Sequence, residues 1–356
     1  MRTVGVEEEF LLVDPEGRPV GVAGIAASGS TVQLELMEQM LETGTRPCAD
    51  AAELADQLAT HRRTAARAAR DAGAHLVALA TSPLPTSASV TDDPRYRRMV
   101  AEFGLTGREQ LTRGCHVHVE VADDEEGVAV LDRIGPWLPC LLAISANSPF
   151  WQGEDTGYAS YRSQVWRRWP TAGPTAPFGS AAAYRSVVAG LVASGAALDE
   201  KMVYFDARLS SRYPTVEVRA ADVCLRQQDA LLLGIVVRAL VETAARDRLA
   251  PVPEPGTRTQ LLQAAAWRAG RSGVCGPLVH PLTLAQAPAA EVVGALFDQL
   301  EDVLVEQGEA DLVAELWSGL LARGSGAVEQ RAWAAAGLRE VLDRAGEATM
   351  AGGHPH

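Results

Sequence analysis

Acidic residues and an arginine recur at strand spacing in two short stretches of this sequence. The stretch GVEEEF near the start carries Glu7 and Glu9, and the stretch PTVEVR carries Glu217 and Arg219. Every second residue of a β-strand points to the same face, about 6.5–7 Å further along. Carboxylates on a half-buried strand need a cation or hydrogen-bond donors nearby, because an uncompensated buried charge is costly. The two stretches therefore indicate a site for metal ions and phosphate, and the alternative is a pair of solvent-facing edge strands.

Two histidines stand at the same spacing in the stretch GCHVHV. His116 offers an imidazole, which is typical of transition-metal sites and acceptable to Mn²⁺ or Mg²⁺. We interpret His118 more readily as a hydrogen-bonded core residue. A zinc site formed by Cys115, His116 and His118 is an alternative, but no second Cys or His group with suitable spacing supports it.

The candidate metal ligands are Glu7, Glu9, Glu42, His116 and Glu217. Hard divalent cations such as Mg²⁺ prefer carboxylate oxygens and complete their coordination with water and substrate phosphates. Two or more cations held in this way would bridge the phosphates of ATP and neutralise charge during phosphoryl transfer. Arg219 would place a guanidinium beside the transferred phosphoryl group. The alternative is that Glu217 and Arg219 form only a same-face ion pair.

The elements that must position these residues are predicted as strands. The first strand is closed by the turn Asp14-Pro15-Glu16-Gly17, and the last two form a hairpin joined by residues 210–214. Glu35, Glu38 and Glu42 lie in a further stretch, residues 32–45. The expected strands are residues 4–13, 75–81, 111–121, 203–209 and 215–218.

Helices are predicted between and after these strands. Asp50 and Glu53 resemble an N-cap pair, and apolar residues then keep helical spacing as far as Leu76. This spacing places the arginines of the helix mostly on its solvent side; they are Arg62, Arg63, Arg67 and Arg70. Residues 127–145 form a second helix that is interrupted near Pro136 and Pro139, and residues 227–243 form a third. The remainder is Ala-rich and helical around the linker 251–255.

A long irregular tract, residues 147–180, separates the histidine strand from the hairpin. It carries seven of the nineteen aromatic residues of the chain. Loops of this length are usually functional or disordered, and the aromatic content argues against disorder. The tract is therefore expected either to cover the substrate or to form a packed loop over the core.

The composition excludes several classes of protein. A net charge of −13 disfavours nucleic-acid binding, which requires clustered cations. Lys201 is the only lysine, which excludes a Walker-type phosphate loop and leaves one candidate for Schiff-base chemistry. The five cysteines are scattered, which is typical of the reducing cytoplasm, and no apolar run reaches the ~20 residues that span a bilayer. We expect a cytoplasmic enzyme that binds neither nucleic acid nor membranes.

Four motifs together resemble the carboxylate-amine ligases of the glutamate–cysteine ligase type 2 family. They are GVEEEF, GCHVHV, SANSPFWQGEDTGYASYRSQVWRRWPTAG and YPTVEVRAADVC, and the resemblance covers essentially the whole chain. It implies an α+β fold with a curved, mainly antiparallel sheet that forms a funnel flanked by helices, similar to the catalytic sheet of glutamine synthetase. ATP and a divalent metal, Mg²⁺ or Mn²⁺, would bind inside the funnel.

The resemblance also implies roles for individual residues. Glu7, Glu9, Glu42, His116 and Glu217 would be metal ligands, with Glu35 a weaker candidate. Glu217 and Arg219 would be catalytic, with Arg219 a phosphate or acyl-phosphate contact. Arg162 would bind the carboxylate of the substrate, together with Tyr158 and Arg219. Where the family tends to show an RQR-like run, this chain has Glu329-Gln330-Arg331, which puts a nucleotide contact at the first position in doubt.

The predicted function is an ATP-dependent ligase that forms an amide through an acyl phosphate, with glutamate and cysteine as the expected substrates. Another acid and amine pair, a metal-dependent hydrolase and a catalytically silent binding protein are the alternatives. Residues 1–250 would form the catalytic sheet with its helices, 251–350 a helical part of the same domain, and 351–356 a flexible tail. The expected partners are small molecules, and a homo-oligomer is left open.

Overall fold

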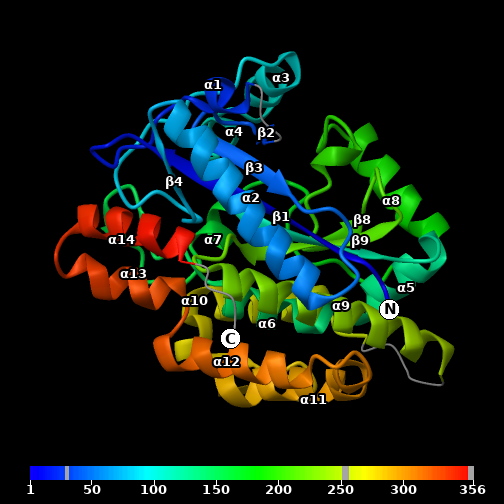
Figure 1. The fold of residues 1–356 in the computed structure, drawn as a ribbon. Helices are drawn as coiled ribbons and strands as arrows, with labels where there is room; N and C mark the ends of the chain where they lie inside the picture. The colour runs from blue at the N-terminus through cyan, green and yellow to red at the C-terminus, as the bar shows by residue number, and fades with distance from the viewer. Residues whose placement is uncertain (29–31, 251–255, 352–356) are drawn as a thin grey trace.

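A computed structural model describes residues 1–28, 32–250 and 256–351, and it shows helices packed around one main sheet (Figure 1). The strands are β1 Val4–Val13, β2 Gln33–Leu34, β3 Met40–Gly44, β4 His75–Val77, β5 Gly114–Glu120, β6 Phe150–Trp151, β7 Glu154–Asp155, β8 Ala207–Leu209, β9 Thr215–Asp222, β10 Pro277–Val279 and β11 Gln286–Pro288. The helices are α1 Ala23–Ala27, α2 Ala51–Asp71, α3 Pro94–Phe103, α4 Leu105–Arg108, α5 Asp124–Ile134, α6 Leu138–Ser145, α7 Arg162–Trp166, α8 Ala181–Ala193, α9 Gln227–Leu249, α10 Thr259–Ser272, α11 Ala289–Glu306, α12 Ala310–Arg323, α13 Gly326–Ala334 and α14 Leu338–Met350. Three short 3₁₀ turns complete the list: η1 Gly135–Trp137, η2 Glu200–Met202 and η3 Gly273–Cys275.

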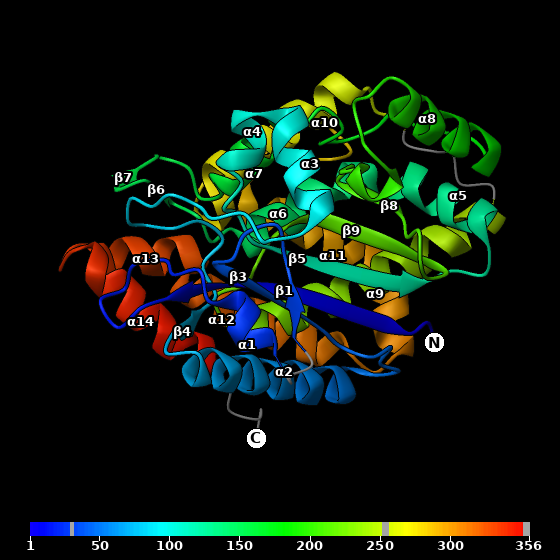
Figure 2. The ribbon, with the colours of Figure 1, turned by 90° about the horizontal axis from the view of Figure 1, so that it is seen from above.

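The main sheet has the strand order β2-β3-β1-β5-β9-β8, with β4 paired to β1 in addition. All of these pairings are antiparallel. Seen from above, β3, β1, β5 and β9 lie side by side (Figure 2). The expected α+β fold with a mainly antiparallel sheet flanked by helices is confirmed.

The two faces of the sheet differ in chemistry because side chains alternate along each strand. One face carries Val4 and Val6 of β1, Val117 of β5 and Val218 of β9, which join one large hydrophobic cluster. The opposite face carries the acids, the histidines and Arg219. A sheet with one apolar and one polar face must cover the first with helices, and its second face is free to line a site.

Helices α9 and α6 cover the apolar face, with α11 and α12 in a further layer beyond them (Figure 1). The same hydrophobic cluster includes Leu54 of α2, Ile235 of α9, Val292 of α11 and Leu320 of α12. Residues before and after the linker 251–255 thus contribute to one core. The linker itself lies outside the described residues, as do residues 352–356 of the expected tail.

The predicted elements are found with small changes of length. The first strand has the expected bounds, and the hairpin of β8 and β9 is confirmed. The strand expected at 75–81 ends at Val77, and that expected at 111–121 spans Gly114–Glu120. Helix α2 begins after Asp50, whose side chain accepts a hydrogen bond from the Glu53 amide at 2.9 Å. The proline-interrupted helix appears as α5, η1 and α6.

Three of the four arginines of α2, Arg63, Arg67 and Arg70, lie on its solvent side as predicted, but the prediction was wrong for Arg62. Its side chain is 2% exposed and forms a bidentate pair with Glu8, with 3.1 Å from Nε to Oε2 and 2.6 Å from Nη2 to Oε1. Glu8 points to the apolar face of the sheet because it alternates with Glu7 and Glu9. The helix and the strand thus each bury one charge, and the two charges compensate each other.

A β-bulge interrupts the pairing of β5 with β9. Cys115 pairs with Ala221 and Val117 pairs with Val218, so that Arg219 and Ala220 together stand opposite His116. The amide of Arg219 donates instead to the carbonyl oxygen of Asp206 at 2.8 Å. Bulges bend a strand and re-aim a side chain, and they are common beside active sites.

One helical stretch, Asp124–Ser145, has the length and apolar composition of a membrane span. Inside this fold 83% of its apolar window is buried. A buried core helix passes the same test of composition, so the stretch is weak evidence for a membrane span.

Candidate active site

The polar face of the sheet forms the floor of a cavity of about 470 Å³. Strands β1, β5 and β9 supply the floor residues, while α3, α7 and the β8–β9 connection supply the walls. Trp166 and Trp169 of the aromatic tract line one wall, so part of that tract does border the cavity. Hydrogen bonds to Asp222 of β9 hold the aromatic tract against the sheet: Asp222 accepts from the hydroxyls of Ser148 and Ser160 at 2.7 and 2.8 Å.

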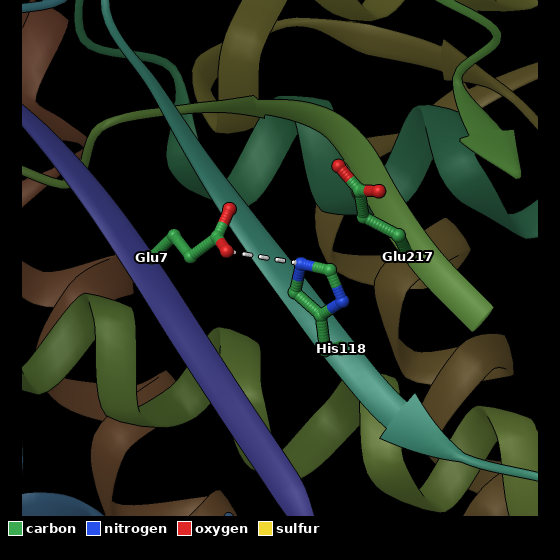
Figure 3. A group of neighbouring side chains, drawn as sticks. All are labelled: Glu7, His118 and Glu217. Atoms are coloured by element: carbon green, nitrogen blue, oxygen red, sulfur yellow. Dashed lines mark ion pairs between the residues drawn. The ribbon is translucent and has the colours of Figure 1, made fainter. Parts of the chain in front are cut away.

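A first group of metal-binding side chains comprises Glu7, His118 and Glu217, from three neighbouring strands (Figure 3). One potential ligand atom from each residue lies within 4.8 Å of the others. His118 Nε2 is 3.4 Å from Oε1 of Glu7, and its Nδ1 is 3.1 Å from the hydroxyl of Thr215. Burial would raise the pKa of Glu7, but the two neighbouring histidines outweigh it and hold the pKa below its usual range. Burial would lower the pKa of His118, but Glu7 and Glu217 raise it.

A second group comprises Glu9, Glu35 and Glu42, whose carboxylates again lie within 4.8 Å of one another. Glu9 accepts a hydrogen bond from the Gly114 amide at 2.5 Å. Burial raises the pKa of Glu9, and burial together with the adjacent Glu35 raises the pKa of Glu42 well above its usual range. Crowded acids of this kind cannot all ionise unless a cation joins them.

His116 stands between the two groups. Its Nδ1 is 3.4 Å from Oε2 of Glu7 and its Nε2 is 3.9 Å from Oε1 of Glu9. Burial and the charge of Arg219 lower the pKa of His116, which favours the neutral imidazole, the form that binds metals. The buried Nε2 atoms of His116 and His118 have no well-aligned hydrogen-bond partner among the described residues.

These donors fit divalent cations that prefer oxygen ligands. The two groups offer five carboxylates and one imidazole, and the unpartnered nitrogen of His116 lies between them. The zinc alternative through Cys115 does not form, because strand alternation places Cys115 in the apolar cluster behind the sheet. The structure thus brings together all five predicted ligands with the weaker candidate Glu35, and it adds His118 to them.

Glu217 is held by two guanidinium groups. Arg208 donates to both of its oxygens, at 2.8 and 3.2 Å, and Arg219 Nη1 donates to Oε1. Burial would raise the pKa of Glu217, but Arg219 and Arg208 lower it, so this carboxylate is ionised. Arg219 also lies over the rings of Trp166 and Tyr204, at 5.8 and 5.9 Å from their centroids.

Arg162 and Tyr158 are not among the described residues that line the cavity. Arg162 is 2% exposed and lies beside the bulge of β9, where Nη2 is 3.4 Å from the carbonyl oxygen of Arg219 and Nη1 is 3.8 Å from Asp222. The hydroxyl of Tyr158 accepts a hydrogen bond from Trp267 at 3.2 Å. Their predicted contact with substrate therefore stays a prediction.

Sequence reasoning missed Arg208 and interpreted His118 as a core residue. Both could have been found from strand pairing, because Glu217 lies directly opposite His118 on β5 and opposite Arg208 on β8. Glu35 gave a weaker signal, since it lies between β2 and β3 and follows no strand alternation. Glu329, at the position where the RQR-like run departs, is bound by Arg226 and does not line the cavity in the described part of the chain.

Known proteins resemble this chain over almost its whole length. The family model described as glutamate-cysteine ligase family 2 matches residues 3–349. A protein of Streptomyces avermitilis named "Putative glutamate--cysteine ligase 2-1" is 51% identical over 355 residues, which covers 97% of this chain and 96% of that protein.

Two solved structures show a similar fold at low sequence identity. A bifunctional glutathione synthetase from Pasteurella multocida has a TM-score of 0.73 and 16% identity; the match covers 98% of this chain and 52% of that one. A glutamate–cysteine ligase from Francisella tularensis in complex with AMP has a TM-score of 0.68 and 14% identity, over 98% of this chain and 89% of that one. The chain therefore belongs to glutamate–cysteine ligase family 2, and it is an ATP-dependent carbon–nitrogen ligase.

Proposed function

We propose that this enzyme joins the γ-carboxylate of glutamate to the amino group of cysteine at the expense of ATP. The observation that carries the proposal is the meeting of Glu7, Glu9, Glu42, His116 and Glu217 with Arg219 on the floor of one cavity. Relatives that are named as glutamate–cysteine ligases support this choice of substrates.

Divalent metal ions, Mg²⁺ or Mn²⁺, complete the proposal. Glu7, His118 and Glu217 would hold one ion, and Glu9, Glu35 and Glu42 would hold a second. His116 lies within reach of both groups. When bound, the ions neutralise phosphate oxygens and thereby make phosphorus more electrophilic.

The side chains of the enzyme supply position and charge rather than a nucleophile. An oxygen of the γ-carboxylate attacks the terminal phosphorus of ATP, which forms the acyl phosphate and releases ADP. The amine then attacks the acyl carbon, and inorganic phosphate leaves as the amide forms and the amine nitrogen loses its proton. Arg219, which donates to Glu217 in this structure, would stabilise the negative charge on the transferred phosphoryl group.

Arg162 and Tyr158 keep a proposed role in recognition of the acid substrate. Arg162 is buried beside the bulge that carries Arg219; burial lowers its pKa, while Asp222 opposes that effect. A substrate carboxylate near the Arg219 end of the cavity would therefore feel two guanidinium charges. Arg162 Nη2 lies 3.4 Å from the carbonyl oxygen of Arg219, and on the same side of β5 as Nε2 of His116.

The choice of amine is the part of the proposal that the cavity supports least. Its apolar wall comprises Leu36, Met40, Met99, Trp166 and Trp169, which offers room for amines other than cysteine. Family membership fixes a reaction type more firmly than a substrate. Another acid and amine pair is therefore the second candidate.

The decisive experiment measures ADP and phosphate release with a panel of amino-acid pairs, in Mg²⁺ and in Mn²⁺. We expect release only when an acid and an amine are both present, and most rapidly with glutamate and cysteine. Faster turnover with a different pair would correct the substrates and leave the reaction type intact. Hydrolysis of an amide without any ATP requirement would instead refute the ligase and indicate a metal-dependent hydrolase.

A further inference from the structure

Arg208 forms a bidentate ion pair with Glu217. The two residues lie directly opposite each other on β8 and β9, and Arg208 donates through Nε and Nη2 to the two carboxylate oxygens, at 2.8 and 3.2 Å. Bidentate pairs of this kind are strong and geometrically specific.

The main chain holds the remaining nitrogen of Arg208. Nη1 donates to the carbonyl oxygens of Lys201 and Val203, at 2.9 and 2.8 Å. All three guanidinium nitrogens are therefore engaged. Arg208 cannot turn toward a ligand without breaking several hydrogen bonds at once.

Arg219 is held far less firmly. It reaches Glu217 through Nη1, which also lies 3.5 Å from Nδ1 of His116. Its Nε is buried without a hydrogen-bond partner in the part of the chain that the structure describes. The rings of Trp166 and Tyr204 flank the guanidinium without fixing it. Of the two arginines on Glu217, Arg219 is thus the one that can move.

We propose that Arg208 is a positioning residue that keeps Glu217 oriented and neutralised while Arg219 leaves Glu217 to bind a phosphoryl group of the nucleotide. This inference rests on the proposed function and adds to it that the two arginines have different roles: Arg208 holds Glu217, and Arg219 binds the nucleotide. The physical reason is that Glu217 is 2% exposed, and a buried carboxylate that loses its last cation is strongly destabilised. With Arg208 in place, the departure of Arg219 leaves Glu217 paired.

The test measures the affinity of ATP by isothermal titration calorimetry with the full chain, in EDTA and again with Mg²⁺. In Arg208→Gln the only guanidinium left on Glu217 is that of Arg219. Arg219 could then bind ATP only by leaving Glu217 buried and unpaired, so ATP affinity should weaken about tenfold, the size of one charge-assisted hydrogen bond. Arg208→Lys should weaken it less, because an ammonium keeps the charge but cannot reproduce the bidentate pair.

Arg2→Gln is the matched control. Arg2 is similarly buried, with 17% of its side chain exposed against 13% for Arg208, and it also binds two carboxylate oxygens and one carbonyl oxygen. It lies outside the cavity lining. Arg2→Gln should therefore leave ATP affinity unchanged, and its thermal unfolding shows what the loss of such a pair does to stability alone.

Two double variants separate the proposed release of Arg219 from a simple effect of charge. Arg208→Gln/Glu217→Gln and Arg208→Gln/Glu7→Gln have the same net charge, and both changes lie in the same cavity. Only the first frees Arg219 from its carboxylate. We expect the first double variant to recover most of the ATP affinity in EDTA, where no metal ligand is needed, and the second to remain weak.

Equal recovery in both double variants would overturn the inference, as would unchanged ATP affinity in Arg208→Gln. If Arg208→Gln fails to fold, Arg208→Lys and Arg208→Lys/Glu217→Gln carry the same comparison. Absence of ATP binding by the unmodified enzyme with Mg²⁺ would count against the proposed function itself, which distinguishes the two failures.

Discussion

The ion pair of Arg62 and Glu8 should be essential for stability although it is hidden from the cavity. Arg62 donates five hydrogen bonds, two to Glu8 and three to the carbonyl oxygens of Cys224, Leu225 and Thr349. These contacts join α2, the central strand β1, the end of β9 and the last helix, α14. We predict that Arg62→Met is among the most destabilising single changes on the sheet.

The magnitude follows from what Arg62→Met leaves behind. Breaking a buried pair by removing one partner costs about 3–5 kcal/mol, because the other charge stays buried without compensation. The three carbonyl oxygens that lose a donor add about 1 kcal/mol each at most. Since folded proteins are stable by only about 5–15 kcal/mol, this change should remove a large part of the free energy of unfolding.

Denaturant unfolding of three variants and of the unmodified chain measures this effect. Glu8→Gln/Arg62→Met should be more stable than Arg62→Met by about 3 kcal/mol, because no unpaired charge remains. Arg67→Met, on the exposed side of the same helix, is the control and should change stability by less than about 0.5 kcal/mol. If Arg62→Met were as mild as Arg67→Met, or if Glu8→Gln gave no recovery, the buried pair would not act as described.

Three further predictions concern the cavity. The pKa values of Glu9 and Glu42 are raised, so these two acids bind more protons in the folded chain than in the unfolded one. Their contribution to stability in EDTA should be fully present below the usual carboxyl pKa of about 4.3 and should be lost as pH rises through the raised values, and Glu42→Gln should flatten this part of the unfolding profile. Adding Mn²⁺ to the metal-free enzyme at neutral pH should raise its unfolding temperature, by less in Glu217→Gln than in the unmodified chain, whereas an equal rise in both would place the ion elsewhere. Arg162→Ala should raise the KM for the acid substrate more than that for ATP, and steady-state kinetics that showed equal changes would assign Arg162 to support of β9 alone.

The site residues that the sequence predicted best are those that depend on strand alternation alone. Glu7 and Glu9 share a face because they are two residues apart, and the same holds for Glu217 and Arg219. What alternation cannot supply is the neighbour of each strand. His118 and Arg208 enter the site only because β5 and β8 flank β9, and that order depends on long-range pairing.

The misplacement of Arg62 arose because residue type was given more weight than spacing. Leu54, Leu58, Arg62 and Ala65 follow one helical stripe, and their spacing alone assigns Arg62 to the buried side. Glu8 alternates on β1 with Val6 and Phe10, which are buried on the apolar face. Two opposite charges that each interrupt an apolar pattern are a signal for a buried pair, but only the fold shows that they meet.

The extra residue of β9 opposite His116 also decides which mutations this enzyme can tolerate. Before Ala220 in the chain, Glu217 and Arg219 face the cavity. After Ala220, Ala221 belongs to the hydrophobic cluster and Asp222 lies near Arg162. Loss of Ala220 itself would leave Ala221 opposite Cys115 and Asp222 opposite Gly114, on their present sides, because regular alternation then continues from Arg219. Loss of Val218 would instead make Glu217 and Arg219 neighbours in the chain, so that the two side chains would point to opposite faces of the sheet. Length changes should therefore be tolerated in the connection at 210–214 and, within β9, only at the bulge, because elsewhere in the strand they would separate Glu217 from Arg219 or exchange the faces of the residues around them.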